Sequence, residues 1–169
     1  ILLARTAFSD PSIHFENTGV VNGSASGEFQ STLAFLEETL PPDLQADFYA
    51  PSATFENSGH VISAKNAIEA DIKLNLKNSG TIETLANVTA IQSSNFRDTI
   101  TNSGTLIGDV YLNDSADVFD GTGGIVQGVV RGGQGWDTLT GGDGDDRFNG
   151  GGGRDVIDGA AGDDRIAGD

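Results

Sequence analysis

The sequence predicts an all-β protein, a right-handed parallel β-solenoid that continues into a β-roll and carries one short helical insertion. Two internal repeats carry this prediction. A seven-residue motif with a central Asn-Ser/Thr-Gly recurs through the first part of the chain, and a nine-residue phrase rich in Gly and Asp fills residues 132–169. In repeats of this kind each copy is one supersecondary unit, and stacking of neighbouring units buries a continuous core.

The seven-residue motif reads apolar, variable, Asn, Ser or Thr, Gly, variable, apolar, which is typical of a strand, a corner and a second strand. Asn tolerates the left-handed backbone conformation and Gly adopts it readily, so the pair can turn the chain without strain. Its Asn positions are 40, 21 and 24 residues apart, and a glycine version follows after 19. These steps predict solenoid turns over residues 1–131. The copies begin at Phe15, Phe55, Leu76, Ile100 and Phe119.

The long first step indicates an insertion at about residues 22–53. Within it apolar residues recur at helical spacing up to a pair of prolines, so we predict an amphipathic helix over about residues 28–39. This helix would cap the flank of the solenoid or, alternatively, offer a docking surface to a neighbouring copy. A smaller helical segment is predicted at residues 67–71. The apolar residues of the longer helix are Phe29, Leu33, Leu36 and Leu40.

The nine-residue phrase has Asp at its sixth position and a large apolar residue at its eighth. Its clustered glycines allow tight corners, and the residues around the eighth position can form a very short strand. Residues 132–169 are therefore predicted to form a β-roll continuous with the solenoid, and the repeat is expected to continue beyond Asp169. The four phrases begin at Gly132, Gly141, Gly150 and Gly159, and their eighth positions are Leu139, Phe148, Ile157 and Ile166.

Two phrases make one turn, so alternate aspartates are expected to stack on the same side of the coil, about 4.8 Å apart. One column contains Asp146 and Asp164, on the side where Gly121 is also expected. The other column extends into the solenoid at steps of 19, 20 and 18 residues, as Asp98, Asp117, Asp137 and Asp155.

A column of carboxylates repels itself unless a cation lies between its members. Carboxylates and glycine carbonyls offer only oxygen ligands, which suit calcium, with six or more ligands at about 2.3–2.6 Å, better than zinc or copper. An EF-hand is excluded because no Glu follows Glu83 to supply its bidentate ligand. The candidate calcium ligands are Gly132, Gly133, Gly135, Asp137, Gly141, Gly142, Gly144, Asp146, Gly150, Gly151, Gly153, Asp155, Gly159, Gly162 and Asp164, with Asp117 as an outlying member.

The phrase resembles the nonapeptide GGxGxDxUx, with U a large apolar residue, of the RTX (repeats-in-toxin, haemolysin-type) family of secreted bacterial proteins. The resemblance implies that calcium binds between successive corners through the sixth-position Asp and backbone carbonyls. It also implies export through a type I secretion channel by an uncleaved C-terminal signal, which would lie beyond Asp169, and so an extracellular or cell-surface location.

The composition of the chain and its lack of several known motifs argue against a number of functions. A net charge of −16 argues against nucleic acid and anionic membrane surfaces as partners, and no apolar run is long enough for membrane insertion. The chain has no Cys, hence no disulfide and no thiolate metal site. His14 and His60 lie in different turns with no repeated spacing. No Gly-x-Ser-x-Gly motif is present, and no Lys follows Lys77 to form a phosphate-binding loop. We therefore expect no enzyme activity.

These observations predict a secreted, calcium-binding structural or adhesive protein of the bacterial cell surface or extracellular matrix, forming filaments or arrays by self-association or by contact with other matrix components. Trp136, on a corner, could stack on a sugar ring, so polysaccharide is a further candidate partner. One alternative is an accessory module of a type I-secreted protease, lipase or polysaccharide-modifying enzyme. A polysaccharide lyase or epimerase acting on the solenoid flank is a third, although no catalytic cluster is visible.

Overall fold

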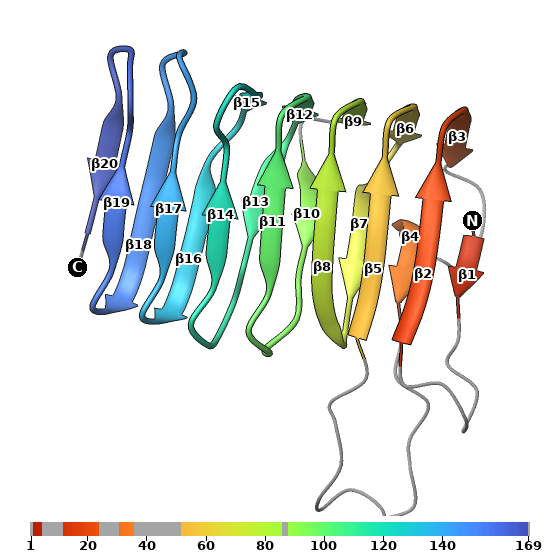
Figure 1. Cartoon of the computed structure of the whole chain (residues 1–169), viewed down its shortest axis with the longest axis horizontal. Coiled ribbons are helices and arrows are strands. Elements are labelled where there is room, and N and C mark those ends of the chain that lie inside the picture. Colours follow the sequence, from red (N-terminus) through yellow and green to blue (C-terminus); the bar gives the residue numbers. More distant parts are fainter. Residues whose placement is uncertain (1, 5–11, 24–30, 36–51, 86–87, 169) are drawn as a thin grey trace, which may run out of the picture.

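In the computed structural model the chain is one coil of short strands stacked along a single axis (Figure 1). The structure describes residues 2–4, 12–23, 31–35, 52–85 and 88–168. Within these ranges it has twenty β-strands and no helix. Strands pair in parallel with the corresponding strands of the turns before and after them. The predicted all-β parallel solenoid is confirmed.

Three sheets form the faces of the coil. The eight-stranded sheet has the order β1 (Leu2–Ala4), β4 (Ser31–Phe35), β7 (Asn66–Ala70), β10 (Thr89–Gln92), β13 (Asp109–Tyr111), β16 (Val130–Gly135), β18 (Arg147–Gly153) and β20 (Arg165–Ala167). The seven-stranded sheet contains β2 (Ser12–Asn17), β5 (Ser52–Asn57), β8 (Lys73–Asn78), β11 (Thr99–Asn102), β14 (Val118–Asp120), β17 (Thr138–Thr140) and β19 (Val156–Asp158). The five-stranded sheet contains β3 (Val20–Gly23), β6 (His60–Ser63), β9 (Thr81–Thr84), β12 (Thr105–Ile107) and β15 (Ile125–Gln127).

The cross-section of the coil changes at β15, where the five-stranded sheet ends and the other two continue. Turns before this point have three strands, and turns in the nonapeptide region have two. In that region Thr138 pairs with Val156, 18 residues later, which confirms two phrases per turn. Because β16 pairs with both β13 and β18, the sheet runs through residue 131 without a break. The division into domains of residues 1–131 and 132–169 stays a prediction.

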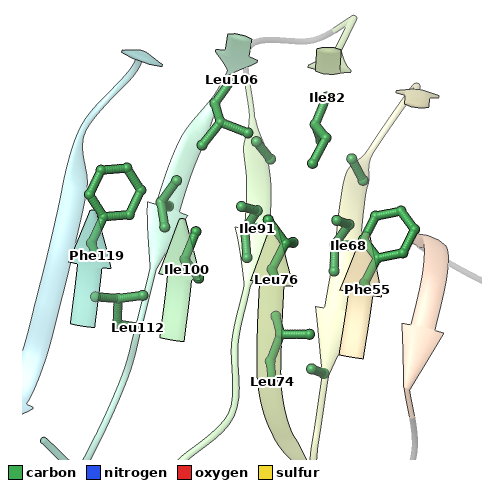
Figure 2. Packing of buried hydrophobic residues seen from close by; sticks show 14 of the residues in the cluster. Phe55, Ile68, Leu74, Leu76, Ile82, Ile91, Ile100, Leu106, Leu112 and Phe119 are labelled. Carbon is green, nitrogen blue, oxygen red and sulfur yellow. The ribbon is translucent and has the colours of Figure 1, made fainter. Parts of the chain in front are cut away.

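The core is a set of apolar side chains that point into the space between the sheets. In the seven-stranded sheet the inward residues stack in register from turn to turn, so each buries the next. Burying one such side chain stabilises the fold by about 1.5–3 kcal/mol. Figure 2 shows Phe55, Leu76, Ile100 and Phe119 of this sheet together with Ile68, Ile82, Ile91 and Leu106 of the other two, all of them at most 1% exposed.

This core thins in the nonapeptide region. Leu139 and Phe148 are still buried, but Val156 is 63% exposed and Ile166 50%. Ordering the backbone costs about 1–2 kcal/mol per residue, and here little apolar burial offsets it.

A ladder of buried asparagines joins the corners of the first part. The Nδ2 groups of Asn17, Asn57 and Asn78 each donate to the Oδ1 of the next asparagine, at 2.8, 2.7 and 2.7 Å, and Asn102 is the last acceptor. A buried donor or acceptor left unpaired costs about 1–3 kcal/mol, so each rung depends on its neighbours. The glycines two residues after Asn57, Asn78 and Asn102 let the corners stack closely, since a Cβ on each would collide with a carbonyl of the preceding corner.

The helix predicted over residues 28–39 is wrong, because its central residues Ser31–Phe35 form strand β4. This strand lies between β1 and β7, with Leu33 opposite Leu2 and Ile68. Pairing along both edges satisfies its backbone groups, and such tertiary pairing overrides a weak local helical periodicity.

The other predicted helical segment, residues 67–71, is also wrong, since residues 67–70 belong to β7. The predicted insertion is shorter than residues 22–53, because β3 extends to Gly23 and β5 begins at Ser52. Residues 24–30 and 36–51 lie outside the described residues.

Candidate metal site

Four aspartates form a column along one side of the coil, each immediately before a strand of the seven-stranded sheet. Asp98, Asp117, Asp137 and Asp155 precede β11, β14, β17 and β19 in that order. The first three each donate a backbone N–H to the Oδ1 of the next, at 2.7, 2.8 and 3.0 Å. Hydrogen bonds to a carboxylate are stronger than those between neutral groups, so the backbone itself holds the column in register. The predicted stacking of these four aspartates is confirmed.

A second column lies on the other side of the coil, before β18 and β20. The backbone N–H of Asp146 donates to Asp164 Oδ1 at 2.9 Å. Asp146 is buried, but its neighbour Asp145 is exposed and accepts the backbone N–H of Asp163 at 2.8 Å. Of each doubled acid, only the sixth-position residue therefore belongs to the inner column.

The first glycine of a phrase leaves a space that the sixth-position carboxylate enters. A Cβ added to Gly132 would lie 2.5 Å from both Asp137 Oδ2 and the carbonyl oxygen of Gly150, one turn further along the coil. Gly141 bears the same relation to Asp146 Oδ2 and to the first glycine of the next turn on its side. A carboxylate oxygen and a carbonyl oxygen from adjacent turns thus face one small space in which only glycine fits.

Two of these carboxylates have an oxygen without a partner. Asp117 and Asp137 are each 1% exposed, and among the described residues their Oδ2 atoms accept no hydrogen bond. Burial raises the pKa of both carboxyls, that of Asp117 to about 7. It also raises the pKa of Asp98 and of Asp146. Because a buried, unpaired carboxylate is costly, Asp117 and Asp137 favour taking up a proton or a cation.

The corner backbone supplies further oxygens. Gly133, Gly135, Gly151 and Gly153 have φ values of 105°, 155°, 84° and 131°. In this conformation the carbonyls of Gly133 and Gly135 point along the coil axis at the glycines of the next corner. In the described part of the chain no three His, Cys, Asp or Glu side chains converge, so carbonyls must supply much of a metal's ligand shell. That donor set fits calcium and is poor for zinc or copper.

The structure brings the predicted ligands together in two sets of corners. Which of their oxygens bind the ion stays a prediction. One set contains Gly132, Gly133, Gly135, Asp137, Gly150, Gly151, Gly153 and Asp155, with Asp117 one turn earlier, and the other contains Gly141, Gly142, Gly144, Asp146, Gly159, Gly162 and Asp164. Gly121 lies on the side of the second set, as predicted, because a Cβ on Gly142 would approach its carbonyl oxygen.

Two features of the corners were missed in the sequence. One is the use of each Asp backbone N–H to hold the column. The other is that Asn113 and Ser115 adopt glycine-like φ values of 71° and 112°. A signal for the second was present, since Asn tolerates this conformation and Asp117 and Phe119 follow at the spacing of the nine-residue phrase.

The fold and the corners together define a parallel β-solenoid with oxygen-lined sites for calcium. Residues 131–166 match the family model of the RTX calcium-binding nonapeptide repeat, in four copies. The C-terminal part of the chain therefore consists of RTX repeats, and these nonapeptide repeats bind calcium. No curated protein and no solved structure matches the chain. Across the described residues there is no helix with the length and apolar character needed to cross a membrane.

Proposed function

We propose that this chain is a secreted, non-catalytic structural or adhesive element whose C-terminal part becomes rigid only when calcium binds. The observation that carries the proposal is the contrast between the two parts of the coil. The solenoid is held by a continuous apolar core and an asparagine ladder. In the described part of the roll few apolar side chains are buried, and the buried Asp137 Oδ2 accepts no hydrogen bond from the described residues. Calcium would supply the missing contacts.

Calcium would act by joining successive corners. It neutralises the facing carboxylates and gives the glycine carbonyls a common partner, so its binding free energy becomes folding free energy. Calcium affinities of about 10⁻⁴–10⁻³ M are typical of extracellular modules, which fits folding after export. Export itself is supported by the RTX repeat, which is typical of type I-secreted proteins.

The structural or adhesive role is supported by the form of the molecule and by its exposed apolar residues. A coil of stacked parallel turns is a stiff rod, and Ile125, Trp136 and Val156 are 56%, 69% and 63% exposed. Exposed aromatic and branched side chains are suited to contacts with another copy, a matrix component or, for Trp136, a sugar ring.

The second candidate is a folding and secretion module of a larger type I-secreted enzyme. The calcium-dependent roll also supports this role as an accessory module. A roll that folds when calcium binds would order an attached domain as readily as it would order a contact between copies in a filament.

Light scattering and electron microscopy of the full-length protein, with calcium and with a chelator, test the choice. We expect ordered assemblies in calcium. A strictly monomeric protein at micromolar concentrations in calcium would refute the assembly role, and hydrolase or lyase activity of the full-length protein would favour the accessory module.

A further inference from the structure

The corner formed by residues 113–117 lies outside the RTX match, which begins at residue 131. Its backbone nevertheless has the conformation of a nonapeptide corner. Asn113 and Ser115 have φ values of 71° and 112°, where Gly133 and Gly135 one turn later have 105° and 155°. Such values cost a residue with a side chain about 1–3 kcal/mol each, and they persist only where the surroundings fix them.

The carbonyls of this corner point in the same direction as those of the nonapeptide corners. A Cβ on Gly133 would collide with the carbonyl oxygen of Asn113, and a Cβ on Gly135 with that of Ser115. Gly151 and Gly153 bear the same relation to the carbonyls one turn before them. The corner therefore presents two backbone oxygens toward the Gly132–Asp137 corner without using glycine.

Asp117 supplies the carboxylate of this corner, and comparison with Asp98 shows which hydrogen bonds the Asp117 carboxylate lacks. Both side chains are at most 1% exposed. Asp98 is satisfied by the protein, since its Oδ1 accepts the N–H of Leu74 at 2.6 Å and its Oδ2 accepts the N–H and the hydroxyl of Ser94, both at 2.9 Å. Asp117 Oδ1 accepts the N–H of Asp98, but its Oδ2 has no partner among the described residues.

We propose that a calcium ion lies between this corner and the Gly132–Asp137 corner, held by Asp117 Oδ2 and by the carbonyl oxygens of Asn113 and Ser115. The column of calcium sites then begins one turn before the RTX repeats. It does not extend back to Asp98, whose carboxylate oxygens already accept hydrogen bonds from the protein. The site differs from the nonapeptide sites at three positions, because Asn113 and Ser115 replace two glycines and the buried Leu112 stands at the position of the first glycine. The proposal rests on calcium binding by the repeats and not on the structural role.

The test is the calcium stoichiometry of the full-length protein, measured by isothermal titration calorimetry. Asp117→Asn should bind one calcium ion fewer per chain than the wild type. Asp114→Asn, an exposed acid of the same corner, should bind the same number. Asp98→Asn, which alters an equally buried member of the same column, should also bind the same number, so it separates loss of a ligand from loss of packing.

Terbium luminescence sensitised by Trp136 provides a second readout, because this only tryptophan lies in the Gly132–Asp137 corner. The terbium signal should fall in Asp117→Asn and persist in Asp114→Asn. Unchanged stoichiometry in Asp117→Asn, or an equal loss in Asp98→Asn, would overturn the proposal while leaving calcium binding by the repeats intact. A wild-type protein that binds no calcium would instead refute calcium binding itself.

Discussion

The buried carboxylates should make the calcium-free protein less stable as the pH rises. Burial raises the pKa of Asp117 from 3.8 to about 7, so between these values the folded chain keeps a proton that the unfolded chain has lost. The resulting stabilisation is complete below about pH 4 and is lost as the pH rises through about 7. One pKa unit corresponds to about 1.4 kcal/mol, so the whole effect is about 4 kcal/mol, of which roughly 2–3 kcal/mol disappears between about pH 5 and pH 8.

Urea unfolding in the presence of a chelator measures this loss, with the far-ultraviolet circular dichroism of the solenoid strands as the probe. Asp117→Asn removes the titrating group. Between about pH 5 and pH 8 the free energy of unfolding of this variant should therefore fall by roughly 2–3 kcal/mol less than that of the wild type. At about pH 8, without calcium, the variant should be the more stable protein. Asp114→Asn removes an exposed charge from the same corner and is the control for the change in net charge. Its free energy of unfolding should change with pH as steeply as that of the wild type. Equal pH slopes for the wild type and Asp117→Asn would refute the reasoning.

Three further outcomes are expected. A chelator should unfold residues 132–169, because the roll has little apolar burial to offset its chain entropy; circular dichroism and protease resistance that do not change on chelation would contradict this. Asp146→Ala should weaken calcium binding at least tenfold and Asp145→Ala hardly at all, since only the first carboxylate lies in the inner column; equal affinities by calorimetry would show that bulk acidity does the binding. Asn78→Ala should lower the free energy of unfolding by about 2–4 kcal/mol, because it leaves the side-chain donor of Asn57 and the side-chain acceptor of Asn102 without their partner in the asparagine ladder. Ser79→Ala, at the exposed neighbouring position, should lower it by less than about 0.5 kcal/mol in the same urea titration.

The register of the coil could be predicted because it is set by residues that recur at fixed steps. Asp98, Asp117, Asp137 and Asp155 are separated by nearly constant numbers of residues, and a solenoid converts constant separation into stacking. The alternation of nonapeptide corners between two sides follows in the same way, since two phrases fill one turn.

Local patterns failed where tertiary pairing decides the structure. The apolar spacing around Leu33 fits a helix, but β4 gains parallel partners on both edges, and the sequence of the strand alone does not contain that information. The asparagine ladder was missed for a related reason. The seven-residue motif indicates only that Asn78 is a turn former. Its side chain also bonds to the turns before and after it, and predicting those bonds requires knowing how closely the corners stack.

Asp117 was predicted as an outlying candidate ligand, but the backbone of the corner at residues 113–117 was not predicted because it lacks the glycines that mark the others. Asn113 and Ser115 adopt the required backbone at a cost in strain, so composition gave no sign of it, and only the Asp and apolar residues at the right spacing remained as evidence. Strain of this kind is visible only once the backbone is known.

The end of the five-stranded sheet at β15 has a consequence for how such a protein can change in length. In a coil each turn contacts only its neighbours, so a whole turn can be added or removed within a stretch of identical cross-section while every other contact is kept. The three-stranded turns joined by asparagines form one interchangeable series, and the two-stranded nonapeptide turns form another. The turn that contains β13, β14 and β15 belongs to neither, because it faces a three-sided neighbour on one side and a two-sided neighbour on the other. Length can therefore vary freely on both sides of this joint, while the joint itself must be present once.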